Sequence, residues 1–192
     1  YRWFAMSVFT YGFGNLMLMP LYPIYQVDRL GISTPQMALL AQLSLVTMIF
    51  AYFYWGRYVD SRSPLRGVVV NVLLNALIPL VYFFAGSAWA LVPAFILVGI
   101  TNAGIDLSYF NSILTFAREE NVARYQALHS FLLGIRGTLA PFAGVAVMHG
   151  LEARGWDIKN LFLISIMIIL TGCAMQVLGV RRRCGGFGVR AG

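Results

Sequence analysis

Six long apolar stretches fill most of this 192-residue chain, and they constrain its fold more than any motif does. The stretches cover residues 3–25, 34–55, 67–85, 88–114, 125–149 and 160–180. A helix of about 20 apolar residues crosses roughly 30 Å of hydrocarbon. Because lipid offers the backbone no hydrogen-bond partners, each crossing segment must satisfy its own polar groups as a helix. We therefore predict an all-α membrane protein, with six transmembrane helices bundled over residues 1–180 and a basic, glycine-rich cytoplasmic tail over residues 181–192.

The positions of the charges predict the orientation of this bundle. The formal net charge is +7, but the basic residues stand mostly at the ends of the apolar stretches, which argues against nucleic acid as a partner. With both chain ends in the cytoplasm, ten of the 14 basic residues lie inside, three lie outside and Arg136 lies within a span. This bias follows the positive-inside rule. We expect an integral, multi-pass protein of the cell or inner membrane, with both ends of this chain cytoplasmic and membrane lipid around it.

The start of the chain and its metal-ligand residue types predict less. The first apolar stretch begins almost directly after Tyr1, so we expect a piece of a longer protein. Cys173 and Cys184 form no paired ligand motif. Twenty residues separate His129 from His149, which is too far along one helix to share a metal. We expect no metal and no cofactor.

A short internal repeat links the first and fourth stretches. Gly12-Phe13-Gly14-Asn15 in the first stretch weakly resembles Gly99-Ile100-Thr101-Asn102 in the fourth, with which it shares the pattern Gly-x-x-Asn. Many transporters contain two groups of helices with the same fold and opposite orientation in the membrane. The match predicts a 3+3 inverted repeat within the six-helix bundle.

Two ionisable side chains lie at membrane depth. Such a residue costs roughly 2.5–3.5 kcal/mol at the centre of an inserted helix, so it is rare and marks a functional site by default. At about 1.5 Å per residue, Asp106 lies about 12 Å and Arg136 about 17 Å from the cytoplasmic ends of their helices. Because consecutive helices are usually neighbours, we expect Asp106 and Arg136 to face each other or a shared polar cavity. The alternative is an ion pair that only locks two helices together.

Further polar residues follow the same helix faces. Asn102, Asp106 and Tyr109 share one face by their spacing, and His129 lies seven residues before Arg136 on the next helix. This concentration favours a lined cavity over scattered polar contacts. Intramembrane carboxylates often serve in proton relays, so Asp106 is our candidate for an acid that carries a proton.

The segment between the second and third stretches carries a family resemblance. Residues 56–66, GRYVDSRSPLR, resemble the signature loop of the major facilitator superfamily, Gly-x-x-x-Asp-Arg-x-Gly-Arg-Lys/Arg. Gly56 and Asp60 match in identity and spacing, the next arginine is displaced to Arg62, and Ser63 and Pro64 replace a glycine and a basic residue. Residues 134–144, GIRGTLAPFAG, are similar to a Gly- and Pro-rich stretch in the fifth or eleventh helix of such proteins, and residues 12–28 to a seventh helix. In topology the resemblance covers residues 3–180.

The resemblance implies a carrier of twelve helices, of which this chain is one half. The C-terminal half is favoured, and the missing six-helix half is then a partner. The resemblance further implies alternating access between the two halves, with Asn15, Asn102 and Asp106 near the substrate. It implies a cytoplasmic gate comprising Gly56, Asp60, Arg57, Arg62, Glu119 and Glu120. In that gate Asp60 bonds the N-terminus of the fifth span and an arginine pairs with a glutamate, unless these are solvated charges worth under about 1 kcal/mol per pair.

Together these observations predict a secondary transporter of the major facilitator type that moves a small organic solute. Its driving force is an ion gradient, most simply of protons, with uniport as the other mode. The predicted cavity and coupling residues are Asp106, Arg136, Asn102, Asn15, Tyr109 and His129. An intramembrane enzyme is one alternative, but Ser130 follows His129 directly, so the two point to diverging faces of the helix. A channel or a non-transporting scaffold is the other, and the sequence contains no Asn-Pro-Ala box of the aquaporin kind.

Overall fold

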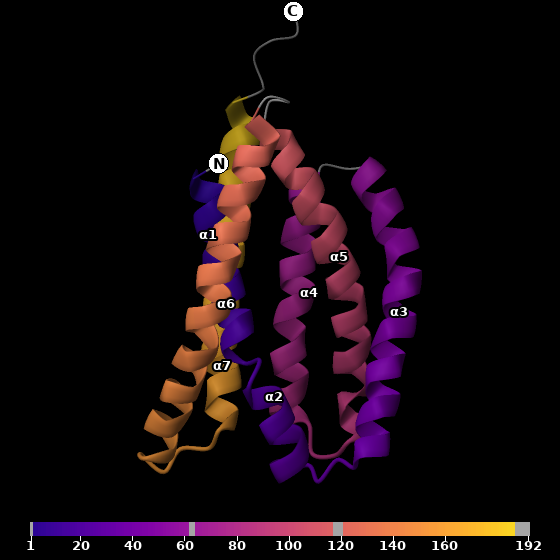
Figure 1. Ribbon diagram of the computed structural model, residues 1–192, viewed down its shortest axis with the longest axis vertical. Helices are drawn as coiled ribbons and strands as arrows, with labels where there is room; N and C mark the ends of the chain where they lie inside the picture. The colour runs from indigo at the N-terminus through magenta and orange to yellow at the C-terminus, as the bar shows by residue number, and fades with distance from the viewer. Residues whose placement is uncertain (1, 62–63, 117–120, 187–192) are drawn as a thin grey trace, which may run out of the picture.

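The computed structural model describes residues 2–61, 64–116 and 121–186, and every regular element in these ranges is a helix (Figure 1). In chain order they are α1 (Arg2–Met17), α2 (Leu21–Ile24), the π-helical turn η1 (Tyr25–Arg29), α3 (Thr34–Ser61), α4 (Pro64–Phe84), the 3-10 turn η2 (Trp89–Leu91), α5 (Val92–Phe116), α6 (Val122–Glu152) and α7 (Lys159–Gly186). Six segments of the described ranges are long and apolar enough to cross a membrane. The prediction of an all-α protein with six spans is confirmed.

Several helices are longer than predicted, and α3 and α7 extend furthest at their C-terminal ends. α3 continues to Ser61, past the predicted end at residue 55, because no glycine or proline interrupts it after Gly56. Pro64 then opens α4, at a position where its missing N–H costs nothing. Most of the predicted loop over residues 56–66 is therefore helix. α7 likewise runs on to Gly186, into the predicted tail.

The first span is broken rather than continuous. α1 ends at Met17, and a turn over residues 18–20 leads into α2. Pro20 has no N–H to donate, so it cannot take part in a continuous helical ladder. Gly144 of α6 packs against this break, because a Cβ on Gly144 would overlap the carbonyl oxygen of Met17. A glycine in α6 thus lets the two backbones meet where α1 ends.

The two triplets of spans are interleaved. α1 packs mainly against α6 and α7, whereas α5 packs mainly against α3 and α4. α4 and α7 join the two groups, and Figure 1 shows α1, α6 and α7 on one side and α3, α4 and α5 on the other. Exchanging the first triplet (α1, α3, α4) for the second (α5, α6, α7) reproduces the same set of contacts. This is the arrangement expected of a 3+3 inverted repeat.

The short sequence repeat falls at equivalent contacts in the two triplets. A Cβ on Gly12 of α1 would overlap the guanidinium of Arg136 on α6. A Cβ on Gly99 of α5 would overlap the carbonyl oxygen of Ser44 on α3. α6 and α3 are each the middle helix of the opposite triplet, so the two glycines perform the same packing role.

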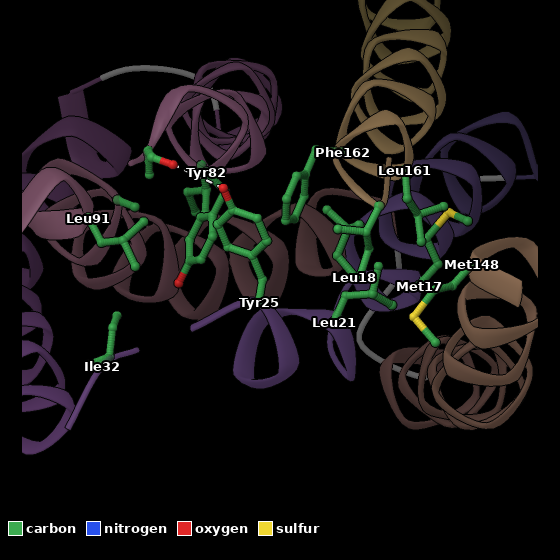
Figure 2. Close-up of a cluster of buried hydrophobic side chains, with 14 of the residues drawn as sticks. Met17, Leu18, Leu21, Tyr25, Ile32, Tyr82, Leu91, Met148, Leu161 and Phe162 are labelled. Atoms are coloured by element: carbon green, nitrogen blue, oxygen red, sulfur yellow. Dashed lines mark hydrogen bonds between the residues drawn. The ribbon is translucent and has the colours of Figure 1, made fainter. Parts of the chain in front are cut away.

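A buried aromatic cluster closes the end of the bundle where the first span ends (Figure 2). The Tyr25 hydroxyl donates to the backbone oxygen of Ala85 at 2.9 Å, and the Gln26 amide donates to the Tyr82 hydroxyl at 2.5 Å. The rings of Tyr25 and Tyr82 both lie against Phe162 of α7, with centroids 5.3 and 5.7 Å away. This cluster ties η1, α4 and α7 together and holds the two groups of helices at this end.

Candidate functional site

Asp106 lies on α5 with its carboxylate exposed beside the α3–α5 contact. Its Oδ2 atom accepts a hydrogen bond of 2.5 Å from the hydroxyl of Tyr52 on α3. Asn102, one turn earlier on α5, is exposed as well, whereas Ala103 between them is buried. The carboxylate is therefore held by one hydroxyl and stays accessible at membrane depth.

Tyr109, one turn after Asp106 on α5, is buried inside the bundle. Its ring stacks on Tyr11 of α1 with centroids 6.4 Å apart and lies 6.0 Å from the ring of His129 on α6. A step of three residues rotates a side chain by about 60° around the helix axis, which is enough to turn it from the surface into the bundle. The predicted polar face of α5 is therefore exposed at Asn102 and Asp106 and buried at Tyr109.

Arg136 of α6 lies across the backbone of α1. Its Nη1 atom donates to the carbonyl oxygen of Val8 at 2.7 Å, and its Nε atom is buried without a hydrogen-bond partner. The guanidinium rests on Gly12, where any side chain would displace it. Tyr11 and Tyr109 lie within electrostatic range of the charge. Arg136 thus joins α6 to α1 through a backbone carbonyl.

The structure does not pair Asp106 with Arg136. Within the described ranges, Asp106 is bonded to Tyr52 and Arg136 to Val8, and no ion pair joins the two charges. The expectation that consecutive helices are neighbours fails here, because the interleaving leaves α5 and α6 in little contact. Each charge instead finds its partner within its own group of three helices.

The two histidines of α6 lie in different environments. His129 is buried, and its ring lies beside that of Tyr109 and within electrostatic range of Arg136. His149 is exposed near the far end of α6, where its Nδ1 atom lies 3.6 Å from a carboxylate oxygen of Glu152. The part of the chain that the structure describes contains no cluster of residues able to hold a metal ion.

Asn15 is half-buried near the end of α1, and its backbone oxygen accepts a bond of 3.3 Å from the N–H of Leu18. It therefore lies beside the break in the first span. The structure shows no contact between its side chain and Asp106 or Arg136 within the described residues.

The predicted cytoplasmic gate is described only in part. Gly56, Arg57 and Asp60 lie on the last turns of α3 rather than in a loop. Arg57 and Asp60 are exposed, and in the described ranges Asp60 makes no hydrogen bond to the start of α6. Arg62, Glu119 and Glu120 lie outside the described residues, so the predicted pairing with them stays a prediction.

Sequence reasoning missed Tyr52 and Gln176. Tyr52 and Asp106 lie roughly 14 and 15 Å from the ends of α3 and α5 at 1.5 Å per residue, so equal depth was the available signal for their contact. Gln176 of α7 is buried and lies near the Tyr109 hydroxyl. A lone glutamine in the last span was the signal for it.

A large hollow on the bundle does not belong to this polar site. It measures about 460 Å³ and lies between α4 and α7. Aliphatic side chains line it, among them Leu73, Leu77 and Leu170. A surface of this kind suits lipid chains and offers nothing to orient a polar solute.

The geometry is that of a six-helix membrane bundle with interleaved triplets of spans, in which a carboxylate and a guanidinium lie apart at membrane depth. The sequence model of the Major Facilitator Superfamily matches residues 4–183 of the chain. The chain therefore belongs to this family, and the bundle has the size of one half of its fold. A comparison with curated proteins finds no match.

Proposed function

We propose that this chain is the C-terminal half of a secondary transporter that moves a small organic solute by alternating access and couples this movement to protons. The observation that carries the proposal is the exposed carboxylate of Asp106 at membrane depth, with one hydroxyl donor and no cationic partner in the described chain. A carboxylate locked in an ion pair would have little reason to take up a proton. An accessible one can exchange a proton with water in a cavity.

The proposed orientation places both ends of this chain in the cytoplasm, because the basic residues gather at that end. The missing six-helix half then packs against this one, and the solute passes between them. α3 and α6 are the least covered of the spans and carry large exposed side chains such as Phe50, Phe53, Phe131 and Phe142. Their exposure supports a role in contact with the second half or with lipid.

The test uses the full-length protein reconstituted in liposomes. We expect Asp106→Asn to abolish solute accumulation that is driven by a proton gradient, while exchange of labelled for unlabelled solute across the membrane continues. The amide has nearly the same shape but cannot release a proton. Asp28→Asn is the matched control, because Asp28 is an exposed acid in η1 at the end of the first span. Accumulation by the Asp106→Asn variant at the wild-type level would exclude Asp106 as the proton carrier.

A further inference from the structure

The charge of Arg136 is not neutralised by any acid of the described chain. Asp106 is bonded to Tyr52 on the other group of helices. The other acids in the described ranges, Asp28, Asp60, Glu152 and Asp157, lie at helix ends or in a loop. Among the described residues the guanidinium donates one hydrogen bond, to the carbonyl of Val8, which is a neutral acceptor. A charge within a membrane span is normally paired or fully hydrogen-bonded, so Arg136 has capacity for an anionic partner.

Further buried donors continue from this charge through Tyr109, which lies within electrostatic range of Arg136, to Gln176 beside Tyr109. The Nε atom of Arg136 is buried with no acceptor. The hydroxyl of Tyr109 and the amide of Gln176 lie next to each other in side chains that are 7% and 4% exposed, and within the described residues neither makes a well-formed hydrogen bond. Guanidinium, hydroxyl and amide groups can all donate to a carboxylate. A site rich in donors and poor in acids favours an anion.

Two features hold these donors in position. The guanidinium lies against Gly12, where the absence of a side chain lets it pack directly on the backbone of α1. The Tyr109 ring stacks on Tyr11 and is flanked by His129, which fixes the side of the bundle on which its hydroxyl lies. Arg136 is only half-buried, so the charge is not sealed in the bundle. The cavity beside it between α1 and α6 is about 10 Å³, room for about one water molecule, so an anion would approach from the open side.

We propose that the transported solute is an organic anion, in its simplest form a carboxylate, and that Arg136 pairs with this carboxylate while Tyr109 and Gln176 donate to it. The proposal rests on the proposed transport function and names the class of its solute. The fork of N–H groups on arginine matches the two oxygens of a carboxylate. A neutral amide of the same shape offers one oxygen and no charge, so the site should discriminate against it.

The test is thermal unfolding of the purified full-length protein in detergent, followed by tryptophan fluorescence. The probes are acetate, benzoate and succinate, each compared with its own amide. We expect at least one carboxylate to raise the unfolding temperature of the wild-type protein in a concentration-dependent way, and its amide to have no effect. Arg136→Gln should weaken the carboxylate about 10- to 100-fold, the range expected for loss of a charged hydrogen-bonding partner. Arg124→Gln, the same change at an exposed site on α6, should bind as the wild type does.

Two further variants keep the test decisive if Arg136→Gln does not fold. Arg136→Lys retains the charge without the fork and should bind the carboxylate more weakly but still prefer it to the amide. Tyr109→Phe retains the ring stack and removes one donor, so it should weaken the carboxylate and leave the unfolding temperature without ligand nearly unchanged. Equal shifts by carboxylates and amides would overturn the proposal. Equal carboxylate binding by wild type and the Arg136 variants, or no shift by any carboxylate, would overturn it too.

The two proposals fail in different ways. Uptake of neutral or cationic solutes by both wild type and Arg136→Gln in liposomes would remove the anion class and leave transport intact. Carboxylate binding that depends on Arg136, without movement of any solute across the membrane, would remove transport and leave the anion site.

Discussion

The close approach of α6 to the break in the first span makes a sharp prediction about Gly144. A Cβ at this position would lie about 1 Å inside the 3.0 Å limit that Cβ atoms observe, and the atom it meets is the backbone oxygen of Met17. A backbone carbonyl cannot swing aside as a flexible side chain can. Gly144→Ala must therefore push α6 away from α1 or distort the turn over residues 18–20.

The expected cost follows from the size of this overlap. Overpacking a tight contact typically costs about 1–3 kcal/mol. Replacing a helical glycine by alanine returns up to about 1 kcal/mol through helix propensity. Gly137→Ala isolates the second effect, because Gly137 lies two turns earlier on α6, is exposed and has no atom within 4 Å of its would-be Cβ. We expect the two variants to differ in stability by about 1–3 kcal/mol, with Gly144→Ala the weaker.

Thermal unfolding of both variants in the same detergent measures this difference. For a chain of this length about 1 kcal/mol corresponds to roughly 2–4 °C in unfolding temperature, so Gly144→Ala should unfold about 2–12 °C below Gly137→Ala. Equal unfolding temperatures would mean that α6 does not approach the break closely. The packing argument for this glycine, and with it the placement of α6 on α1, would then be wrong.

Two predictions concern the neighbours of the proposed site. Tyr52→Phe removes the hydroxyl that donates to Asp106 and should cost about 1 kcal/mol of stability. Tyr54→Phe on the same helix should cost nothing, because the Tyr54 side chain is exposed. Equal unfolding temperatures of the two variants would show that the Tyr52 bond contributes nothing. Asp60→Ala should slow solute uptake in liposomes without changing which solutes compete, because Asp60 lies at the end of α3, away from Asp106 and Arg136. Uptake at the wild-type rate would show that Asp60 is an ordinary solvated residue with no role in transport.

The spans could be predicted because apolar length alone determines whether a helix can cross a bilayer. The ends of the helices could not be predicted in the same way, since charged residues at a membrane surface can continue a helix. Arg57 and Asp60 look like loop residues in the sequence but extend α3. The break after Met17 was encoded by Pro20 and Pro23, whose effect on a helix is known, yet the unbroken apolar character of residues 3–25 concealed it.

The site was predictable in its depth but not in its partners. Asp106 and Arg136 could be located because charges stand out in apolar helices. Their partners depend on which helices touch, and the interleaving of the two triplets places α5 against α3 and α6 against α1. No local pattern in the sequence encodes that exchange. The rule that consecutive helices are neighbours is general, and an inverted repeat is a structure in which it fails.

The separation of the two charges bears on how a transporter of this kind can work. An Asp106–Arg136 pair would neutralise both groups within the protein and would bind one group of helices to the other. Instead, Asp106 is held within the α3–α4–α5 group and Arg136 within the α1–α6–α7 group, each by a neutral oxygen-containing partner. Under the proposed function, Asp106 is thus free to serve as the proton site and Arg136 as the anion site, each within its own group of helices. α4 and α7 join the two groups, so the coupling that we propose between these sites runs through the packing of the helices and not through direct contact between the charges.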